Sequence, residues 1–358
     1  MQRWEIILVV TTNIVRPLGS GPRALSCASA LGLCGMLVVV GLTADVADAS
    51  DPAKTVGPNA CAECHKMEAE AWKGTHHFKT FREMPRNGKA NEIADKMGVR
   101  RIRSDTLCIG CHFTVQQKND SVEPIAGISC ESCHGGGRDW IKVHSGFSGK
   151  TPLFESKAEE KARWRLADSK GMIRPLSFYL LAKNCFACHV VPQEDLVNKG
   201  GHKAGSDFDL VAWSQGEVLH NTLYSKGREN VPASAARKRM LYLIGLGAEF
   251  EAALRAIAKA TVRKSYAFAM AKRADQARKL LAAAAQAAPN VPEIGKMVEL
   301  AHSAGLQLNN ERALTAAADG VSKQLESITE RYDGNTMAGL DGLIPGPDKY
   351  KGTARKPD

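Results

Sequence analysis

Eight cysteines of this sequence form four pairs, and in every pair the spacing is Cys-x-x-Cys with a histidine directly after it. Two thiols three residues apart on a turn of helix reach the two vinyl groups at one edge of a porphyrin, and the next histidine reaches its iron. The pattern predicts four attachment sites for c-type haem. The motifs are Cys61-Ala-Glu-Cys64-His65, Cys108-Ile-Gly-Cys111-His112, Cys130-Glu-Ser-Cys133-His134 and Cys185-Phe-Ala-Cys188-His189.

Three other uses of cysteine pairs compete with haem attachment. A zinc ribbon uses Cys-x-x-Cys pairs but needs no histidine after all of them, and a thioredoxin-like dithiol would occur once. A disulfide framework suits an exported chain but leaves the four histidines unexplained. Covalent haem accounts for the whole pattern, with His65, His112, His134 and His189 as the proximal iron ligands.

Each haem iron offers a sixth coordination position, so the other histidines are candidate distal ligands. We expect His302 to lie on a helix surface, because it stands far from the motifs. The six histidines outside the motifs are His76, His77, His144, His202, His220 and His302.

The first and third motifs resemble those of the tetrahaem cytochrome c-554 family. The first is followed by Trp72-Lys73-Gly74-Thr75-His76-His77, and the third lies within Gly127-Ile-Ser-Cys130-Glu-Ser-Cys133-His134-Gly-Gly-Gly-Arg138. The resemblance covers only the haem-binding half of the chain. It implies a loop-rich, mainly α-helical multihaem unit.

The resemblance also implies distal ligands for two haems. It maps His77 onto the third haem and His144 onto the first, which predicts the pairs His134/His77 and His65/His144. Ligands crossing between distant segments would fasten together a chain with few apolar core residues. His76 is the neighbour that could be confused with His77.

Two later histidines, His202 and His220, do not have the spacing of the family. The glycines around His202 would let the backbone approach a haem closely. Trp213 precedes His220 by about two helical turns and could stack on a porphyrin edge. If both bind iron, each of the four haem irons has two histidine ligands and no open coordination position. If only one does, the haem on His112 is five-coordinate and can take a small ligand.

The N-terminal residues 1–49 resemble a signal peptide. Arginines precede an uncharged apolar run, and the small-x-small sequence ending at Ala49 predicts cleavage there. An uncleaved anchor is the alternative, although the run is short for a membrane span. Cys27 and Cys34 would leave with this segment. The predicted location is the periplasm, with no stable membrane insertion of the mature chain.

Beyond the signal peptide the sequence divides into three parts. Residues 50–230 form the tetrahaem unit, with helices expected at 59–73, around each motif and at 158–184. Residues 231–333 are alanine-rich with helical periodicity, which predicts an all-α bundle of three or four antiparallel helices. Residues 334–358 read as a flexible tail rich in glycine, proline and lysine.

Composition supports this division. Of 358 residues, 44% are hydrophobic but only 6% aromatic, which excludes a disordered chain and a polytopic membrane protein. Because aromatic side chains are few, haems must supply much of the core of the first half. The net charge is +10. Residues 231–280 are strongly basic whereas 281–350 are net acidic, so the charge is asymmetric.

These features favour a periplasmic electron carrier over an enzyme. The expected partners are redox proteins. The resemblance implies a donor like a hydroxylamine oxidoreductase, a quinol-oxidising enzyme is equally open, and the acceptor would be another cytochrome. Nucleic acid is not expected, since an exported chain rarely meets it. One alternative is a reductase of nitric oxide or another nitrogen oxide at a five-coordinate haem on His112. Another is a polymer in which a histidine of one subunit ligates a haem of the next.

Overall fold

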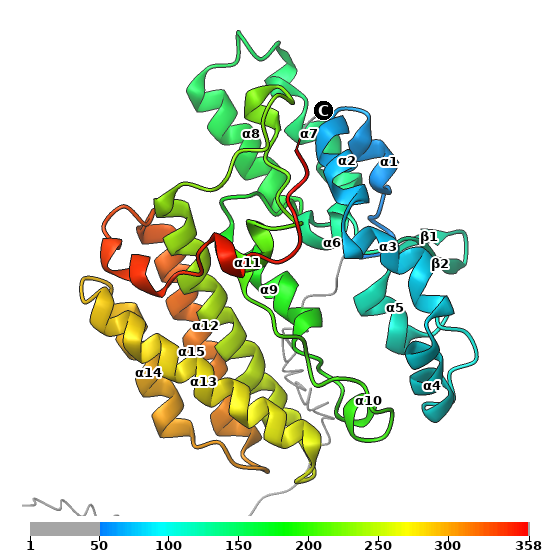
Figure 1. Ribbon diagram of the computed structural model, residues 1–358. Helices are drawn as coiled ribbons and strands as arrows, with labels where there is room; N and C mark the ends of the chain where they lie inside the picture. The colour runs from blue at the N-terminus through cyan, green and yellow to red at the C-terminus, as the bar shows by residue number, and fades with distance from the viewer. Residues whose placement is uncertain (1–50, 357–358) are drawn as a thin grey trace, which may run out of the picture. The chain divides into compact units, whose positions relative to one another are not determined.

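The computed structural model describes residues 51–356, all within one compact unit. As predicted, the fold is mainly α-helical, with one two-stranded sheet among the described residues (Figure 1). No helix in this range has the length and apolar character that crossing a membrane requires. The predicted signal peptide, with Cys27 and Cys34, lies outside the described residues.

Each Cys-x-x-Cys-His motif lies on or beside a short helix. The first motif begins in α1 (Pro58–Ala62), and its histidine directly precedes α2 (Lys66–Lys73). The other three motifs end their helices at the histidine, so each imidazole stands where the helix stops. These helices are α5 (Thr106–His112), α6 (Cys130–His134) and α9 (Phe178–His189).

The rest of the first half consists of short helices and loops, as expected for a unit with few apolar residues. Only a small cluster of buried residues (Ala94, Val99, Ile102, Phe113) lies around α4 and α5. The other elements are α3 (His76–Glu83), η1 (Met84–Arg86), α4 (Gly88–Lys96), η2 (Gly137–Asp139), α7 (Ile141–His144), η3 (Phe147–Gly149), α10 (Glu194–Asn198), α11 (Leu210–Ser214) and η4 (Leu223–Ser225).

Two helices that the sequence predicted as continuous are each divided. The expected helix at 158–184 is α8 (Lys157–Ser169) and the later α9, separated by Gly171 at φ +93° and by Pro175. A left-handed glycine and a proline both stop a helix, so the interruption has a local cause. The expected helix at 59–73 is divided between α1 and α2.

A β-hairpin that the sequence pattern did not predict connects the second and third motifs. Strand β1 (Thr114–Lys118) pairs antiparallel with β2 (Ser121–Ala126), and Lys118 stands opposite Ser121. The two-residue turn between them contains Asn119 at φ +52°, a conformation that asparagine tolerates. Because β1 follows α5 and β2 precedes α6, the hairpin brings the end of α5 close to the start of α6.

The second half forms the predicted helical bundle. Helix α12 packs against α13 and α15, and α14 packs against the same two helices. The largest fully buried side chains, such as Phe250, Tyr266 and Leu281, all lie in this half. The same apolar core extends into α9, so the fourth motif is packed on the bundle (Figure 1). The bundle helices are α12 (Ala235–Lys259), α13 (Ser265–Ala287), α14 (Pro292–Ala304) and α15 (Glu311–Arg331).

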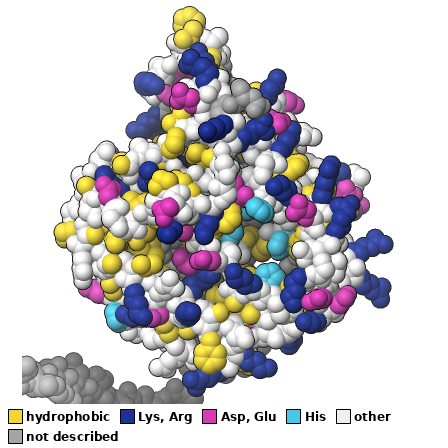
Figure 2. Space-filling model, in the orientation of Figure 1, with side chains coloured by type: hydrophobic (Ala, Val, Ile, Leu, Met, Phe, Trp, Pro, Cys, Tyr) yellow, Lys and Arg dark blue, Asp and Glu magenta, His cyan; other side chains and the backbone are white. Residues whose placement is uncertain are grey.

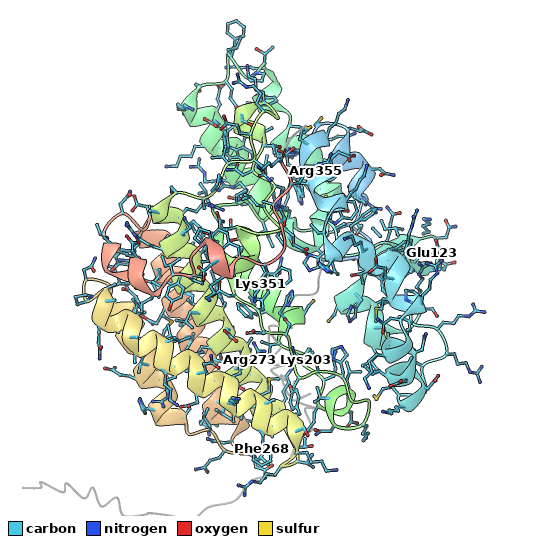
Figure 3. The ribbon with its side chains drawn as sticks, viewed as in Figure 1. Glu123, Lys203, Phe268, Arg273, Lys351 and Arg355 are labelled. Atoms are coloured by element: carbon cyan, nitrogen blue, oxygen red, sulfur yellow. The ribbon has the colours of Figure 1, made fainter. Side chains whose placement is uncertain are left out.

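The C-terminal segment differs from the flexible tail that its composition predicted. It forms η5 (Ala338–Leu343) and η6 (Pro347–Lys349), and Leu340 is fully buried in the bundle core. The Lys351 backbone N–H donates to the Ala212 carbonyl (3.0 Å), and Arg355 reaches the Glu70 carbonyl (3.1 Å; Figure 3). The apolar and hydrogen-bonding partners that order this segment lie far away in the sequence.

Candidate functional site

Eight histidines of the described chain meet in four pairs, each with one motif histidine and one histidine from elsewhere. No pair is in direct ring contact, and the spacing is nearly constant. The centroid distances are 6.2 Å for His65–His144, 6.2 Å for His77–His189, 6.3 Å for His112–His202 and 6.2 Å for His134–His220. Figure 2 shows several histidine side chains around a hollowed region of one face.

The pairing agrees with the sequence expectation at one site and differs at another. His144 lies opposite His65, as expected, but His77 lies opposite His189 instead of His134. The partner of His134 is His220. The position of His77 at the start of α3 depends on packing against Gly127, whose absent Cβ would meet the His77 carbonyl oxygen at 2.1 Å. Spacing along the chain carries no information on that contact.

The two later histidines, for which the family spacing gave no haem, both lie opposite a motif histidine. His202 faces His112 from the loop after α10, and His220 faces His134 from the segment after α11. The remaining two are engaged elsewhere. His76 is largely exposed and its Nδ1 lies 2.7 Å from Glu217 Oε2, while His302 Nε2 lies 2.9 Å from the Arg278 guanidinium.

Most of the paired imidazoles have their Nδ1 atom occupied by a hydrogen-bond acceptor. An Nδ1–H that donates to an acceptor leaves Nε2 as the nitrogen available to a metal, and it fixes the ring orientation. The acceptor is a backbone carbonyl in four cases and a hydroxyl in one. The contacts are His134 to Ile173 O (2.8 Å), His144 to Ile141 O (2.7 Å), His202 to Lys203 O (2.7 Å), His220 to Val218 O (2.6 Å) and His189 to Ser206 Oγ (2.5 Å).

Burial keeps the inner imidazoles uncharged. Desolvation, with a smaller effect of neighbouring imidazoles, lowers the pKa of His112, His134 and His189 to about 4. The pKa of His77 is also lowered, again chiefly by burial. These rings are neutral near pH 7, and the neutral form is the one that binds iron.

The motif cysteines show how the four sites adjoin one another. Cys61 of the first motif lies beside Cys130 of the third, and this contact together with burial raises the pKa of Cys61. In the same way Cys188 of the fourth motif lies beside Cys111 of the second, and this contact and burial raise the pKa of Cys188. The third and fourth motifs also adjoin.

The link between the third and fourth motifs is a direct contact. Asn184 Nδ2 of α9 donates to the Cys133 carbonyl at 3.1 Å. The Cys133 thiol also lies close enough to Cys185 to add to the rise that burial causes in the pKa of Cys185. Together the contacts arrange the motifs in the spatial order first, third, fourth, second.

Glu131, inside the third motif, positions the haem-binding segments in a way that the sequence pattern did not predict. Its side chain is buried and accepts three backbone N–H bonds, from Val56 (2.8 Å), Gly57 (2.7 Å) and Gly137 (2.7 Å). The carboxylate therefore fastens the segment before the first motif to the loop after the third. A charged residue between the two cysteines of a buried motif was the only signal in the sequence.

Helix α8 contacts His144, the histidine opposite the first motif, through Arg163. Arg163 on α8 donates to the His144 carbonyl at 2.5 Å and forms a bidentate ion pair with the Glu155 carboxylate (2.7 and 2.6 Å). The Arg163 and Glu155 side chains are 5% and 4% exposed, so the pair is shielded from solvent. Helix α8 thus holds α7, and with it His144, in place.

The bundle contacts the fourth site through Arg273 on α13 (Figure 3). Its guanidinium donates to the Ser206 carbonyl (2.6 Å) and to Glu249 (2.5 Å), and the Ser206 hydroxyl in turn accepts from His189. Phe208 stacks on the His189 ring at 4.2 Å. The alanine-rich half of the chain therefore helps to orient a motif histidine.

Two further observations bear on the group that these residues could hold. Among the described residues, no cluster of three or more His, Cys, Asp or Glu side chains could hold a metal ion, as a zinc ribbon would. The buried indole N–H groups of Trp140 and Trp213 have no acceptor in the described chain, and Trp140 lies 5.2 Å from the His144 ring. An anionic group such as a haem propionate beside these rings would satisfy them, so the residues fit c-type haem.

The comparisons with known proteins agree with this chemistry. Residues 60–135, which contain the first three motifs and His77, match the family described as "Cytochrome c554 and c-prime". Over 37% of its length the chain is 34% identical to the cytochrome c-554 of Nitrosomonas europaea, and the match covers 57% of that relative. The chain thus spans a little over half the length of this curated relative. No solved structure matches it.

Proposed function

We propose that this chain, whose residues 60–135 match the cytochrome c554 family, is a multihaem c-type cytochrome that binds four haems covalently and carries electrons between redox partners. Haem supplies one-electron redox chemistry when bound. The protein's own residues set the attachment, the axial ligation and the surroundings of each iron.

The observation that carries the proposal is the constant separation of the four imidazole pairs. A metal–nitrogen bond of about 2 Å on each side, with roughly 1 Å from a ring nitrogen to the ring centre, gives about 6 Å between centroids. The observed 6.2–6.3 Å supports a single iron between the rings of each pair. The proximal ligands are His65, His112, His134 and His189, and their distal partners are His144, His202, His220 and His77.

The spatial order of the motifs supports a linear electron route with two ends. The first and second motifs stand at the ends, and the third and fourth stand between them. One redox partner would then dock near His65 and His144, and the other near His112 and His202. Such an arrangement suits a carrier that receives an electron at one end and delivers it at the other.

The position of His202 favours a carrier over a small-molecule reductase. A reductase needs an open coordination position, and the haem on His112 was the candidate for one. His202 stands 6.3 Å from His112, the same separation as in the other pairs. Two histidines on one iron leave no position for nitric oxide or nitrite.

The location and the partners complete the proposal. The predicted signal peptide of residues 1–49 supports export to the periplasm, where c-type haem attachment takes place. The donor would be a hydroxylamine oxidoreductase-like or quinol-oxidising enzyme, and the acceptor another cytochrome.

A spectroscopic count of haems and spin states tests the proposal. The purified chain should contain four haems, all low-spin when oxidised and unresponsive to nitric oxide. His202→Ala and His220→Ala should each convert one haem in four to high-spin. His76→Ala is the matched control, because His76 is engaged by Glu217, and it should leave all four low-spin. A high-spin haem in the unmodified protein would overturn the closed-site proposal.

A further inference from the structure

The turn before α8 exposes two large apolar side chains to solvent. Leu153 is 91% exposed and Phe154 is 75% exposed, although both belong to an ordered turn. The Phe154 N–H donates to the Thr151 carbonyl at 3.0 Å, and Pro152 occupies the second position of the turn, which proline favours. We call residues 151–154 the apolar tip.

The base of the apolar tip is held rigidly, so the exposure is a property of the fold. Glu155, the next residue, forms the buried ion pair with Arg163. Lys150, on the other side, pairs with Glu159 at 2.7 Å, and Ser156 caps α8 through the Glu159 N–H. The residues that precede and follow the tip are therefore both fixed to α8.

A basic face of α8 lies directly beyond the tip. Lys157, Lys161 and Arg165 recur every four residues and line a shallow depression of about 280 Å³. Trp164 lies in the same depression, with the Arg174 guanidinium 5.4 Å from its ring. Glu160 is the acidic residue of the lining. Figure 2 shows apolar side chains at the apex of this face and basic ones below them.

We propose that the apolar tip and the basic face of α8 bind the surface of an anionic phospholipid membrane. Leu153 and Phe154 enter the boundary between headgroups and acyl chains, and Lys161 and Arg165 lie among the lipid phosphates. Protruding apolar side chains beside lysine and arginine are the features that hold a protein in this interface. Tryptophan is enriched at the same depth.

The size of the surface favours a membrane over a protein partner. A stable protein interface buries about 800 Å² on each side around a broad apolar centre. Here the apolar part is a single turn, and the surface around it is charged. Two protruding side chains are too few for such an interface, but they are enough to enter a lipid layer.

The inference goes beyond the proposed carrier function and does not depend on it. It has one consequence for that function, because α8 holds α7 and His144 through Arg163. Binding of the tip would bring the His65–His144 end of the route to a membrane surface. The protein would then meet one redox partner at the membrane without a membrane-spanning segment.

Cosedimentation of the purified holoprotein with vesicles tests the proposal, with Soret absorbance as the readout. The protein should bind vesicles of equal parts phosphatidylglycerol and phosphatidylcholine, and it should not bind pure phosphatidylcholine. Raising the salt should weaken binding, because exposed charges are screened. Leu153→Ser with Phe154→Ser, and separately Lys161→Gln with Arg165→Gln, should each lower the partition coefficient about tenfold or more.

Phe268→Ser is the matched control, because Phe268 is a 55% exposed aromatic on α13, away from α8 (Figure 3). It should bind vesicles as the unmodified protein does. No binding to anionic vesicles, which would leave the tip to a protein partner, overturns the proposal. So does equal loss in the control, or displacement by inorganic phosphate beyond that by chloride at the same ionic strength, which would indicate a simple anion site.

Discussion

His77, at the start of α3, lies with its ring centroid 6.2 Å from that of His189, at the end of α9. A helix near the beginning of the haem-binding half is thereby joined to one packed on the C-terminal bundle. The pair connects the segment that matches the cytochrome c554 family with a motif outside the matched region. A test of this pairing therefore tests how the two parts of the chain cooperate.

The ring planes give a way to test which histidines share an iron. The planes of His65 and His144 are 18° apart, and those of His134 and His220 are 79° apart. Parallel rings make the two iron d orbitals that interact with the ligands differ in energy, whereas perpendicular rings leave them nearly equal in energy. We expect a rhombic low-spin electron paramagnetic resonance signal from the first pair and a highly anisotropic one from the second.

Single variants should remove these signals selectively. His77→Ala should make one haem high-spin and leave the highly anisotropic signal intact, because its partner is His189. His220→Ala should abolish that signal. If instead His77→Ala abolishes it, His77 ligates the third haem, as the family resemblance implied, and the pairing in the structure is wrong.

Ser206 should tune the potential of the haem on His189. Its hydroxyl accepts a hydrogen bond from His189 Nδ1 at 2.5 Å, which makes the imidazole a stronger donor and favours ferric iron. Ser206→Ala should raise the potential of that haem. A net hydrogen bond of about 1 kcal/mol corresponds to roughly 40 mV for a one-electron couple.

A spectropotentiometric titration measures this change. Ser169→Ala is the control, because Ser169 is an exposed residue of α8 whose hydroxyl bonds only to its own helix, and it should shift no potential. An unchanged or lowered potential in Ser206→Ala would show that the hydroxyl does not act on the iron through His189.

Glu155 should make stability depend on pH in the acid range. Hydrogen bonds from Arg163 lower the pKa of Glu155 below its ordinary value of 4.5. Because the folded-state pKa is the lower one, ionised Glu155 stabilises the fold fully above its unfolded pKa. This stabilisation is lost as the pH falls through the folded-state pKa.

Denaturant unfolding of Glu155→Gln beside the unmodified protein checks this sign. The variant should be less stable near pH 7, and the difference should shrink steadily as the solution is taken below pH 4.5. Glu92→Gln, in an exposed pair with Lys89, is the control and should show little difference at any pH. A difference that grows on acidification would contradict the assignment.

The sequence carries the haem-attachment pattern but only part of the geometry around it. The four motifs follow from local spacing, the pair His65/His144 follows from the family resemblance, and the helical bundle follows from periodicity. The partner of His77 does not, because it depends on α3 packing against Gly127. The buried carboxylate of Glu131 and the hydroxyl of Ser206 also act through contacts between distant segments. Leu340 is buried for the same reason, and local composition could not indicate that.

Gly127 should be essential for the position of His77. A Cβ at this residue would lie 2.1 Å from the His77 carbonyl oxygen, a separation that no real contact allows, so Gly127→Ala must move the start of α3. We expect one high-spin haem, as in His77→Ala, and a stability loss of about 1–3 kcal/mol. Gly295→Ala is the control, since Gly295 lies on α14 with nothing near the added methyl group, and it should be as stable as the unmodified protein or slightly more so. The optical spectrum and a denaturation curve of each variant measure both effects. Four low-spin haems in Gly127→Ala would mean that His77 keeps its position without this contact.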